Sequence, residues 1–394
     1  MYRIKTLNQI ALRGLERFPR DRYEVAGEFQ EPDALILRSH RLASDDLGPS
    51  LRAIARAGAG VNNIPVDACS DRGIVVFNTP GANANSVKEL VFGMALMAAR
   101  QLKEAVAFAG SLDPALDAAA LNSAVEAEKK AFKGSELAGK TLGVVGLGAI
   151  GSRVAEAALA FDMDVLGYDP AISIDAAWRL PSRVQRMENL TTLFNRSDYV
   201  TLHVPLLPQT QGLVNNDSLT AFQPGAVLMN FAREPIVDAA ALRRALDSGR
   251  IGRYIADFPV PDLVGHPRVL TTPHLGASTA EAEENCAVMA ADQLRDFLER
   301  GNIHNSVNFP AVRLDDATGH RLAVINRNVP GMIGQITSAL AKHDINVIDM
   351  LNRSREDVAY NLIDCSAPVS APVVSAVSAI DSVINVRTFA AQSS

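Results

Sequence analysis

Apolar residues along this chain form short continuous runs that alternate with longer amphipathic stretches. Runs of the first kind cover residues 34–37, 53–57 and 74–77, and each is followed by turn residues or by a helical pattern. A short apolar run bounded by turn residues is typical of a parallel strand buried on both faces, whereas apolar positions three to four residues apart are typical of a helix. The alternation predicts a parallel sheet covered by helices, with its first strand starting near Tyr2 and Ile4.

The same alternation resumes after Gly134 and predicts a second doubly wound unit. Its expected strands are 142–146, 164–168, 199–203, 226–229, 252–256 and 268–271. Amphipathic spacing predicts helices at 86–100 and 281–300, the second ending before Gly301. The segment 109–128 is rich in alanine, and we expect it to form a weakly specified helical or loop connection on the surface.

The pattern changes beyond a polar, turn-prone linker at 315–319. We expect, in chain order, a strand at 321–326, a helix at 331–343, strands at 346–353 and 358–365, a helix at 371–379 and a strand at 383–388. This βαββαβ order is the ferredoxin-like arrangement. It carries no pocket-building glycine turn and no cluster of His, Cys or carboxylate residues. That composition indicates a regulatory or assembly module, and extension of an oligomer interface is the alternative.

Composition fits a soluble globular protein of two or three domains, with 394 residues, 48% hydrophobic and 21% charged. The net charge of −6 does not favour nucleic acid or an acidic membrane as a partner. Cys69, Cys286 and Cys365 follow no metal-binding pattern and are expected to be buried in a reducing compartment, so no metal is predicted. No apolar run has membrane-spanning length and no signal core is visible, so we expect a cytoplasmic protein.

The sequence LGVVGLGAIG at 142–151 places three glycines between an apolar run and an amphipathic stretch. A strand, a tight glycine turn and a helix start form the site that a dinucleotide pyrophosphate requires, because glycines admit a close approach and the helix offers free N–H groups. The cofactor-binding residues expected here are Gly146, Gly148, Ala149, Ile150 and Gly151.

A second apolar run, Met163–Tyr168, ends in Asp169, 23 residues after Gly146. A carboxylate at this spacing accepts hydrogen bonds from both hydroxyls of the adenosine ribose. The next residues are Pro170 and Ala171 rather than Arg or Lys, which argues against a 2′-phosphate and favours NAD over NADP. The alternative is that Asp169 only ends the strand.

Three later segments carry titratable residues at expected strand ends, where ligands bind in such sheets. The residues are Arg233, Asp257, Asp262 and His274. Oxidation of a 2-hydroxy acid requires a base for the hydroxyl proton, a guanidinium that holds the carboxylate, and an acid that orients the imidazole. His274, Arg233 and Asp262 are able to fill these roles in that order.

Each of these three residues also has a structural interpretation. His274 lies at an expected strand end, where a buried structural histidine is equally compatible with the sequence. Arg233 is compatible with a solvent-facing loop, and Asp262 follows Pro261, where an Asp usually forms a turn. Spacing alone does not decide between the two interpretations.

Several segments together resemble the D-2-hydroxyacid dehydrogenase family, and within it the branch of D-3-phosphoglycerate dehydrogenases. They are ARAGAGVNNIPVD (55–67), FNTPGANANSVKEL (77–90), GKTLGVVGLGAIG (139–151), HVPLLPQT (203–210), NFAREPIVD (230–238) and PHLGAST (273–279). The resemblance extends over essentially the whole chain and implies an α/β fold with two doubly wound Rossmann-like domains, the first discontinuous, plus a C-terminal ferredoxin-like ACT domain. The implied boundaries are 1–96 with 288–310 for the substrate domain, 97–287 for the NAD-binding domain and 319–394 for the ACT domain.

This resemblance implies that Arg233 clamps the substrate carboxylate and that His274 is the acid–base residue. Asp262 takes the place of the family's glutamate and is one methylene shorter. Glu234 and Pro235 follow Arg233, where the family usually has glycine. The remaining cofactor contacts that the resemblance implies are His203, Pro205, Phe231, Ala232 and Asp257.

Basic residues in the first half of the chain indicate a phosphorylated substrate, although any one of them alone is compatible with an ordinary solvent-exposed residue that binds no ligand. Arg38 and Ser39 follow an expected strand end, and Arg56 opens a glycine turn whose N–H groups suit a carboxylate. The substrate residues expected are Arg38, Ser39, Arg56, Ala57, Gly58, Asn83 and Lys129. Asn83 and Lys129 are implied by the resemblance. In the family, a basic residue at the position of Lys129 reaches the phosphate of the substrate that is bound to the neighbouring subunit. The resemblance also implies a homodimer or homotetramer that oxidises D-3-phosphoglycerate to 3-phosphohydroxypyruvate with NAD.

The resemblance of the tail to an ACT domain implies an L-serine effector bound by Asn326, Asn328 and Asn346. Serine-inhibited members often have His at the first of these positions, so inhibition stays open. Two other functions remain compatible with the sequence. One is reduction of another 2-oxo acid, such as hydroxypyruvate or 2-oxoglutarate, and the other is a non-enzymatic NAD(H)-sensing protein on the same scaffold.

Overall fold

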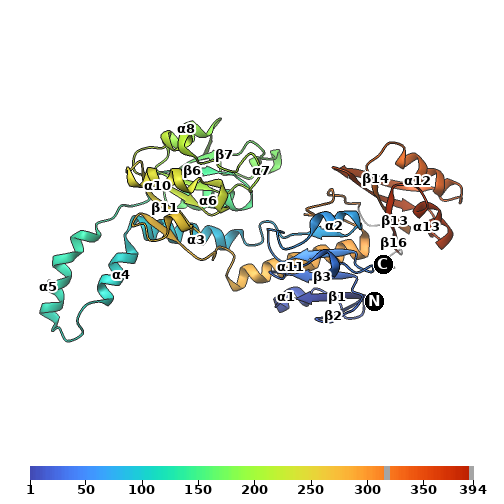
Figure 1. Ribbon diagram of the computed structural model, residues 1–394, viewed down its shortest axis with the longest axis horizontal. Helices are drawn as coiled ribbons and strands as arrows, with labels where there is room; N and C mark the ends of the chain where they lie inside the picture. Colours follow the sequence, from blue (N-terminus) through green and yellow to red (C-terminus); the bar gives the residue numbers. More distant parts are fainter. Residues whose placement is uncertain (315–319, 390–394) are drawn as a thin grey trace. The chain divides into compact units, whose positions relative to one another are not determined.

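The computed structural model describes residues 1–314 and 320–389, so the expected linker at 315–319 lies outside the described residues. The chain divides into two compact units. One consists of Met1–Ala82 with Ala280–Ser394, and the other of Asn83–Thr279. The expected fold class is confirmed, because two sheets are parallel and a smaller one is antiparallel (Figure 1). None of the described helices combines the length and apolarity needed to cross a membrane.

The first unit is built on a five-stranded parallel sheet in the order β2-β1-β3-β4-β5. Its strands are β1 (Tyr2–Leu7), β2 (Tyr23–Ala26), β3 (Ala34–Leu37), β4 (Ala53–Arg56) and β5 (Val75–Phe77). Every residue of β3 is buried, which is why this central strand has a continuous apolar run. The connections hold the short helices α1 (Leu12–Leu15) and α2 (Val66–Asp71).

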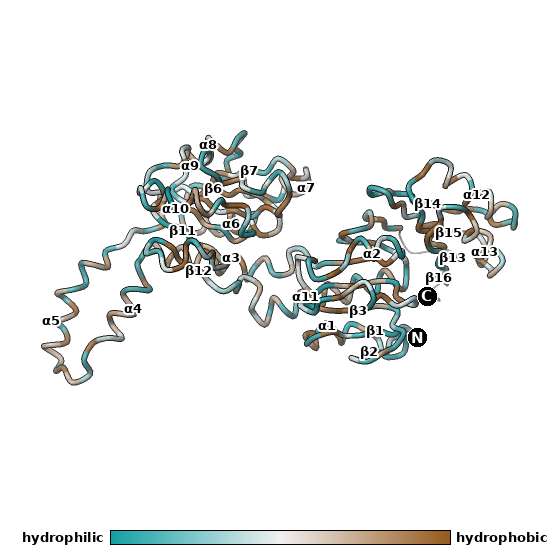
Figure 2. Tube along the Cα trace, in the orientation of Figure 1, coloured by the Kyte–Doolittle hydropathy of each residue, from teal (hydrophilic) through white to brown (hydrophobic). Residues whose placement is uncertain are grey.

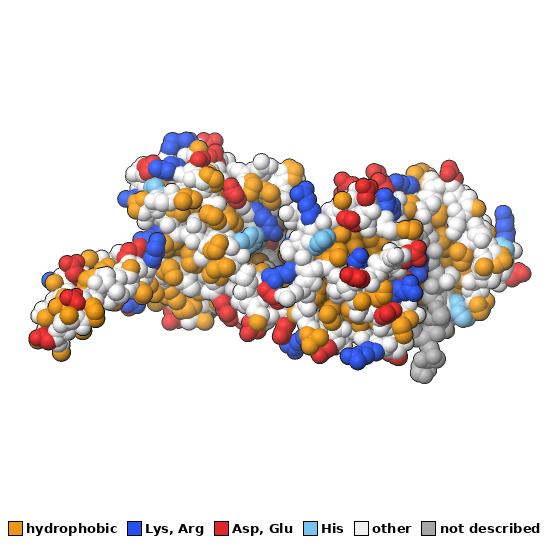
Figure 3. All heavy atoms as spheres, turned by 60° about the horizontal axis from the view of Figure 1, so that its bottom comes forward, with side chains coloured by type: hydrophobic (Ala, Val, Ile, Leu, Met, Phe, Trp, Pro, Cys, Tyr) orange, Lys and Arg blue, Asp and Glu red, His pale blue; other side chains and the backbone are white. Residues whose placement is uncertain are grey.

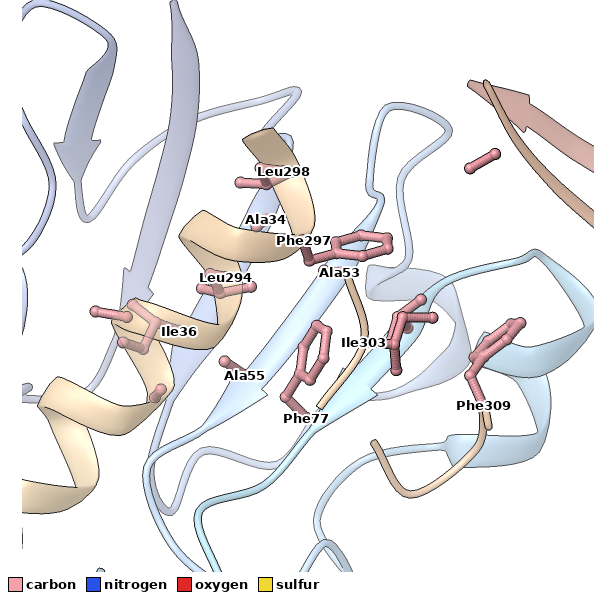
Figure 4. Close-up of a cluster of buried hydrophobic side chains, with 14 of the residues drawn as sticks. Ala34, Ile36, Ala53, Ala55, Phe77, Leu294, Phe297, Leu298, Ile303 and Phe309 are labelled. Atoms are coloured by element: carbon pink, nitrogen blue, oxygen red, sulfur yellow. The ribbon is translucent and has the colours of Figure 1, made fainter. Parts of the chain in front are cut away.

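The long helix α11 (Ala280–Arg300) packs its apolar face on this sheet. Figure 4 shows its side chains against alanine and isoleucine side chains of β3 and β4 and against Phe77 of β5. Phe297 meets Phe77 edge to face, with ring centroids 5.6 Å apart. Burying one such side chain fully stabilises the fold by about 1.5–3 kcal/mol, so the second half of α11 is firmly held.

The second unit contains a seven-stranded parallel sheet in the order β12-β11-β10-β9-β6-β7-β8, and hydrophobic stretches of the trace are visible within this unit in Figure 2. The strands are β6 (Thr141–Val145), β7 (Asp164–Tyr168), β8 (Val184–Arg186), β9 (Tyr199–Leu202), β10 (Ala226–Asn230), β11 (Ile251–Ala256) and β12 (Val269–Thr271). All the expected strands are present, and the edge strand β8 is additional. The strand order reverses between β6 and β9, and ligands bind such sheets at the carboxyl ends beside this point.

Helices form two hydrophobic clusters with this sheet, one containing α3 and α6 and the other α8, α9 and α10. The helices of the unit's body are α3 (Ala84–Ala99), α6 (Ala149–Ala160), α7 (Ile174–Trp178), α8 (Leu190–Arg196), α9 (Asn216–Thr220) and α10 (Ala239–Asp247). Because α3 packs with α6, the unit begins at Asn83, whereas the sequence analysis expected 97. Similarly, α11 belongs to the first unit from its first residue, which ends the second unit at Thr279 rather than at 287.

The alanine-rich segment forms an arm that projects from the second unit (Figure 1). It contains α4 (Leu102–Gly110), α5 (Ala118–Glu128) and the 3₁₀ turn η2 (Lys129–Phe132). No residue of either α-helix is buried. The surface of the arm carries hydrophobic side chains among acidic ones (Figure 3), including Val106, which is 70% exposed.

The C-terminal module belongs to the first unit and has the expected βαββαβ order, with an antiparallel sheet in the order β14-β15-β13-β16. Its elements are β13 (His320–Arg327), α12 (Met332–Ala341), β14 (Val347–Arg355), β15 (Val358–Cys365), α13 (Ala371–Ser378) and β16 (Val383–Phe389). The two helices pack on one face of the sheet. The other face joins the core around α11, where the Tyr360 hydroxyl donates to the Gly301 carbonyl at 2.7 Å.

Candidate active site

The glycine turn of the second unit connects β6 to α6. Gly146 has a φ of +89°, and a Cβ there would lie 2.7 Å from a backbone carbonyl oxygen of the neighbouring loop. A Cβ on Gly151 would overlap the Gly146 carbonyl, so only glycine lets the helix start this close to the turn. Gly148 and Ala149 are exposed at the start of α6, and Ile150 is half-buried. The first N–H groups of α6 are therefore accessible to an anionic ligand.

Asp169 follows β7 and is tied to the same turn. Its Oδ2 accepts a hydrogen bond from the Leu147 amide at 2.8 Å, and its Oδ1 accepts one from the Ala171 amide at 2.9 Å. The carboxylate is half-buried and keeps lone pairs for further donors, such as the hydroxyls of a ribose. The sequence analysis expected the ribose contact and did not anticipate the bond to Leu147.

His203 directly follows β9 and carries a neutral imidazole. Its Nε2 lies 2.9 Å from the Thr201 hydroxyl, and loss of solvent lowers the pKa of His203 to about 3. Its Nδ1 is buried and has no hydrogen-bond partner among the described residues. A buried ring nitrogen beside the glycine turn suits a bound cofactor that supplies the missing partner. Of the other cofactor residues expected nearby, Pro205 is exposed, and Phe231 and Ala232 are buried after β10.

Backbone hydrogen bonds join the loops that follow β10, β11 and β12. The Asn230 carbonyl accepts from the Asp257 amide at 3.3 Å, and the Asp257 carbonyl accepts from the His274 amide at 2.8 Å. The side-chain amide of Asn230 also donates to the Arg233 carbonyl at 2.9 Å. One series of hydrogen bonds therefore holds the backbones of Arg233 and His274 at the carboxyl ends of β10 and β12. These two strands flank β11 and are about 9.6 Å apart, twice the spacing of adjacent strands.

The carboxylate of Asp257 organises the loop that carries His274. It is buried, and its Oδ1 accepts from the Thr272 hydroxyl and the Leu275 amide, both at 2.7 Å. Its Oδ2 accepts from the Gly276 amide at 2.7 Å. Donors from residues 272–276 thus surround the Asp257 carboxylate, and these hydrogen bonds fix the backbone on both sides of His274.

The two side chains expected to carry the chemistry are both exposed at this edge of the sheet. His274 has a φ of +60°, a left-handed conformation that costs a residue with a Cβ about 1–2 kcal/mol and that the Asp257 contacts maintain. Arg233 follows β10 and bends back on its own loop, because its Nη1 donates to the Ala232 carbonyl at 2.6 Å. Neither side chain is occupied by an ion pair among the described residues.

Asp262, the expected acid partner of His274, lies in the 3₁₀ turn η4 (Pro261–Leu263) and is exposed. Its backbone carbonyl accepts from Arg243 Nη1 at 2.7 Å. Within the described part of the chain, no hydrogen bond or ion pair joins its carboxylate to the His274 ring. The structure therefore links Arg233, Asp257 and His274 through their backbones and leaves Asp262 outside that set of contacts.

Most of the expected substrate residues lie in the first unit, at the carboxyl ends of β3 and β4. Arg56 ends β4, and its Nε donates to the Arg38 carbonyl at 3.0 Å. A Cβ on Gly58 would lie 2.6 Å from Arg56 Nη1, so the turn sits directly on that guanidinium. Ala57 is buried and Ser39 is exposed.

Two further expected substrate residues lie in the second unit. Asn83 immediately precedes α3, and its side-chain oxygen is buried with no hydrogen-bond partner among the described residues. Lys129 is exposed in η2 and forms an ion pair with Glu126 at 2.5 Å. In the described residues, no group of His, Cys, Asp or Glu side chains has the arrangement needed to hold a metal ion.

The three expected effector residues differ in exposure. Asn326 is buried in β13, where its Oδ1 accepts from the Asn361 side chain at 2.7 Å. Asn328 is exposed in the following turn and donates to the Glu356 carbonyl at 3.1 Å. Asn346 is exposed just before β14. Only the last two therefore present side chains at the surface of the module.

A family model described as the NAD binding domain of D-isomer specific 2-hydroxyacid dehydrogenases matches residues 92–276. Residues 92–276 belong to this family. D-3-phosphoglycerate dehydrogenase of Methanocaldococcus jannaschii is 34% identical over 83% of this chain, and that of Rattus norvegicus is 36% identical over 78%. The chain spans 61% and 56% of the lengths of these relatives, respectively.

Solved structures of similar fold agree with this assignment. NAD⁺-bound 3-phosphoglycerate dehydrogenase of Entamoeba histolytica has a TM-score of 0.61 and 27% identity, covering 78% of this chain and 98% of that one. The TT0316 protein of Thermus thermophilus has a TM-score of 0.62 and 30% identity, covering 77% and 99%. Together with the glycine turn and Asp169, these matches identify NAD as the cofactor of residues 92–276.

Sequence reasoning missed the uncharged residues that hold this site together. Asn230 fixes the Arg233 loop and Thr272 binds the Asp257 carboxylate, but neither has a charge or motif that marks it. The one available signal was position, because both lie at a strand end beside a residue that was singled out. The role of Asp257 as the centre of the His274 loop was also not anticipated.

Proposed function

We propose that this protein is an NAD-dependent dehydrogenase that oxidises D-3-phosphoglycerate to 3-phosphohydroxypyruvate, the first step of L-serine synthesis. The observation that carries the proposal is the hydrogen-bonded set of loops that presents Arg233 and His274 at the carboxyl ends of β10 and β12. Support also comes from the relatives, which bear this activity in their names across archaea, bacteria and animals.

In the proposed reaction, Arg233 binds the substrate carboxylate through its planar fork and stabilises negative charge on the oxygen at C2. His274 accepts the proton of the C2 hydroxyl as the C–H bond at the same carbon breaks and the carbonyl forms. When bound, the nicotinamide ring supplies the hydride acceptor. The left-handed backbone of His274 and the three hydrogen bonds that the Asp257 carboxylate accepts keep the imidazole positioned for this transfer.

The phosphate preference is proposed to come from Arg38 and Arg56, with Ser39 and the Ala57–Gly58 turn alongside. Two guanidinium groups at neighbouring strand ends suit a phosphate dianion, which carries several strong acceptor oxygens. Lys129 and Asn83 are proposed to complete substrate binding, with Lys129 acting on the neighbouring subunit. The buried, unpaired oxygen of Asn83 supports a ligand contact at that position.

Steady-state kinetics over a panel of D-2-hydroxy acids with and without phosphate test this function. We expect kcat/KM with NAD to be highest for D-3-phosphoglycerate, and we expect His274→Asn to lower kcat by about 100-fold or more, the usual contribution of a general base. Arg38→Ala is expected to raise KM for 3-phosphoglycerate and to leave KM for D-glycerate nearly unchanged. A substrate without phosphate that is used better, or His274→Asn with full kcat, would contradict the proposal.

The assembly and the effector are proposed on separate grounds. We propose a homodimer or homotetramer in the cytoplasm, in which the exposed apolar side chains of α4 and α5 pack against a second subunit. Light scattering of the intact protein tests this proposal.

We also propose that Asn328 and Asn346 bind L-serine, because both are exposed in the C-terminal module. Titration of L-serine against the initial rate tests this proposal, and no inhibition at millimolar serine would refute it.

A further inference from the structure

Arg38, proposed above to bind the substrate phosphate, is already paired with a carboxylate. Its Nη1 lies 2.6 Å from Oε1 of Glu283, which belongs to the first turn of α11. The two side chains are 37% and 43% exposed, so both stay in contact with water. An ion pair of this kind contributes little net stability, and an anionic ligand with several oxygens is able to displace it.

Glu283 belongs to the same small cluster as the two candidate phosphate-binding arginines. Arg56 donates to the Arg38 carbonyl, which fixes the ends of β3 and β4 together. Cys286 lies almost one turn further along α11, and burial raises the pKa of its thiol. Arg38 and Arg56 act on that pKa in the lowering direction and Glu283 in the raising direction, as expected when all three charges lie near the thiol.

A phosphate bound to Arg38 would bring a second anion to the guanidinium that Glu283 occupies. The guanidinium presents its donors as a planar fork that matches one oxyanion bidentately, and the Glu283 contact uses one arm of that fork. Glu283 also repels a nearby dianion twice as strongly as it repels a monoanion at the same distance. Both effects act on a phosphorylated ligand and are absent for one that does not reach Arg38.

We propose that Glu283 is a specificity-determining residue that competes with the substrate phosphate for Arg38 and so weakens binding of phosphorylated substrates. This inference rests on the proposed function, because that function assigns the phosphate to Arg38. It makes the first turn of α11 part of substrate selection. A neutral side chain of the same shape at this position should raise the preference for phosphate.

The chain provides a matched control at the next position of α11. Glu284 forms an ion pair with Arg13 at 3.1 Å and has a similar exposure of 42%. Glu283→Gln and Glu284→Gln therefore remove the same charge from the same turn of the same helix. Only the first removes it from the partner of Arg38.

The test measures the ratio of kcat/KM for D-3-phosphoglycerate to kcat/KM for D-glycerate in the intact protein. We expect Glu283→Gln to raise this ratio about fivefold at low salt and less at high salt, because the repulsion acts at a solvated, screened site. Glu284→Gln should leave the ratio unchanged. In the Arg38→Ala background, Glu283→Gln should give a clearly smaller gain, because the competition for Arg38 is gone and only the direct repulsion of the phosphate is relieved.

Calorimetric titration of inorganic phosphate supplies a readout that does not depend on turnover. Glu283→Gln is expected to bind phosphate about fivefold more tightly than the wild type and Glu284→Gln. If the wild type does not oxidise 3-phosphoglycerate, the proposed function fails and the phosphate titration decides this inference. An unchanged or lower ratio, or unchanged phosphate binding, overturns it, because Glu283 would then be neutral or would position Arg38 for the ligand.

Discussion

The buried carboxylate of Asp257 offers the sharpest test of how the fold supports the candidate active site. Its two oxygens accept three hydrogen bonds from the loop that carries His274, namely from Thr272, Leu275 and Gly276. Asp257→Asn keeps the size of the side chain and removes the charge. One oxygen becomes an NH₂ group, so the substitution changes the hydrogen bonding without creating a cavity.

The magnitude follows from those three contacts. The amide oxygen is able to keep the two donors that now meet Oδ1, but these bonds lose their charge assistance. The NH₂ group then faces the Gly276 amide, so a buried donor is left without an acceptor, and Asp257 itself is only 5% exposed. An unsatisfied buried donor costs about 1–3 kcal/mol, and a charge-assisted hydrogen bond is worth roughly twice a neutral one, so we expect a loss of about 2–4 kcal/mol.

Urea unfolding followed by circular dichroism measures this loss, and steady-state kinetics measures its effect on the site. Asp262→Asn is the control, because that exposed carboxylate forms no hydrogen bond or ion pair among the described residues. It should change the free energy of unfolding by no more than about 0.5 kcal/mol. Asp257→Asn should also lower kcat by about tenfold or more, because looser positioning of a catalytic group is costly.

Comparing Asp257→Asn with Asp262→Asn distinguishes two roles. One is the acid partner of His274, which the sequence analysis expected Asp262 to be, and the other is the carboxylate that holds the His274 loop. If Asp262 acts as the acid partner of His274, Asp262→Asn lowers kcat and leaves stability unchanged, whereas Asp257→Asn lowers both. An Asp257→Asn variant with wild-type stability and wild-type kcat would refute the argument that this carboxylate holds the His274 loop.

The remaining predictions concern two buried charged or titratable groups. His203 binds a proton near pH 6.5 in the unfolded chain and only near pH 3 in the folded protein, so acid favours the unfolded state. The free energy of unfolding should therefore fall by up to about 1.4 kcal/mol for each pH unit below 6.5. Urea titrations at several pH values should show a shallower dependence for His203→Asn, and parallel curves would contradict this. Asp364 pairs with the buried Arg321 at 2.7 Å, so Asp364→Ala should cost about 3–5 kcal/mol in chemical denaturation, and the double variant Arg321→Met/Asp364→Leu clearly less.

The strands of both parallel sheets were predictable because they are buried on both faces and therefore have continuous apolar runs. The strands that escaped prediction lie at the edges. β8 consists of Val184, Gln185 and Arg186, and a three-residue edge strand with polar side chains does not differ from a loop in its pattern. The arm was expected only as a weakly specified helical or loop connection on the surface, and it consists of the helices α4 and α5, which bury no residue.

The domain boundaries show a second limit of sequence patterns. The apolar face of α3 was recognisable, but periodicity does not reveal which sheet that face covers. Its partner is α6, more than fifty residues later, so α3 belongs wholly to the second unit. Asn326 is a comparable case at the level of one residue. An amide next to a turn suggests exposure, and only the pairing of β13 with β15 brings Asn361 against it and buries both.

The position of α11 ties the candidate site of the first unit to the C-terminal module. Near its start, Glu283 contacts Arg38, and at its end the Arg300 carbonyl accepts from Arg321 at 3.0 Å. The Tyr360 hydroxyl binds the Gly301 carbonyl, and a Cβ on Gly301 would lie 2.8 Å from Leu362 of the same module. Movement of the module away from α11 would expose this apolar contact and leave the buried Arg321 without one of its acceptors. The module is therefore part of the same compact unit as the helix that carries Glu283, and the two share one hydrophobic core.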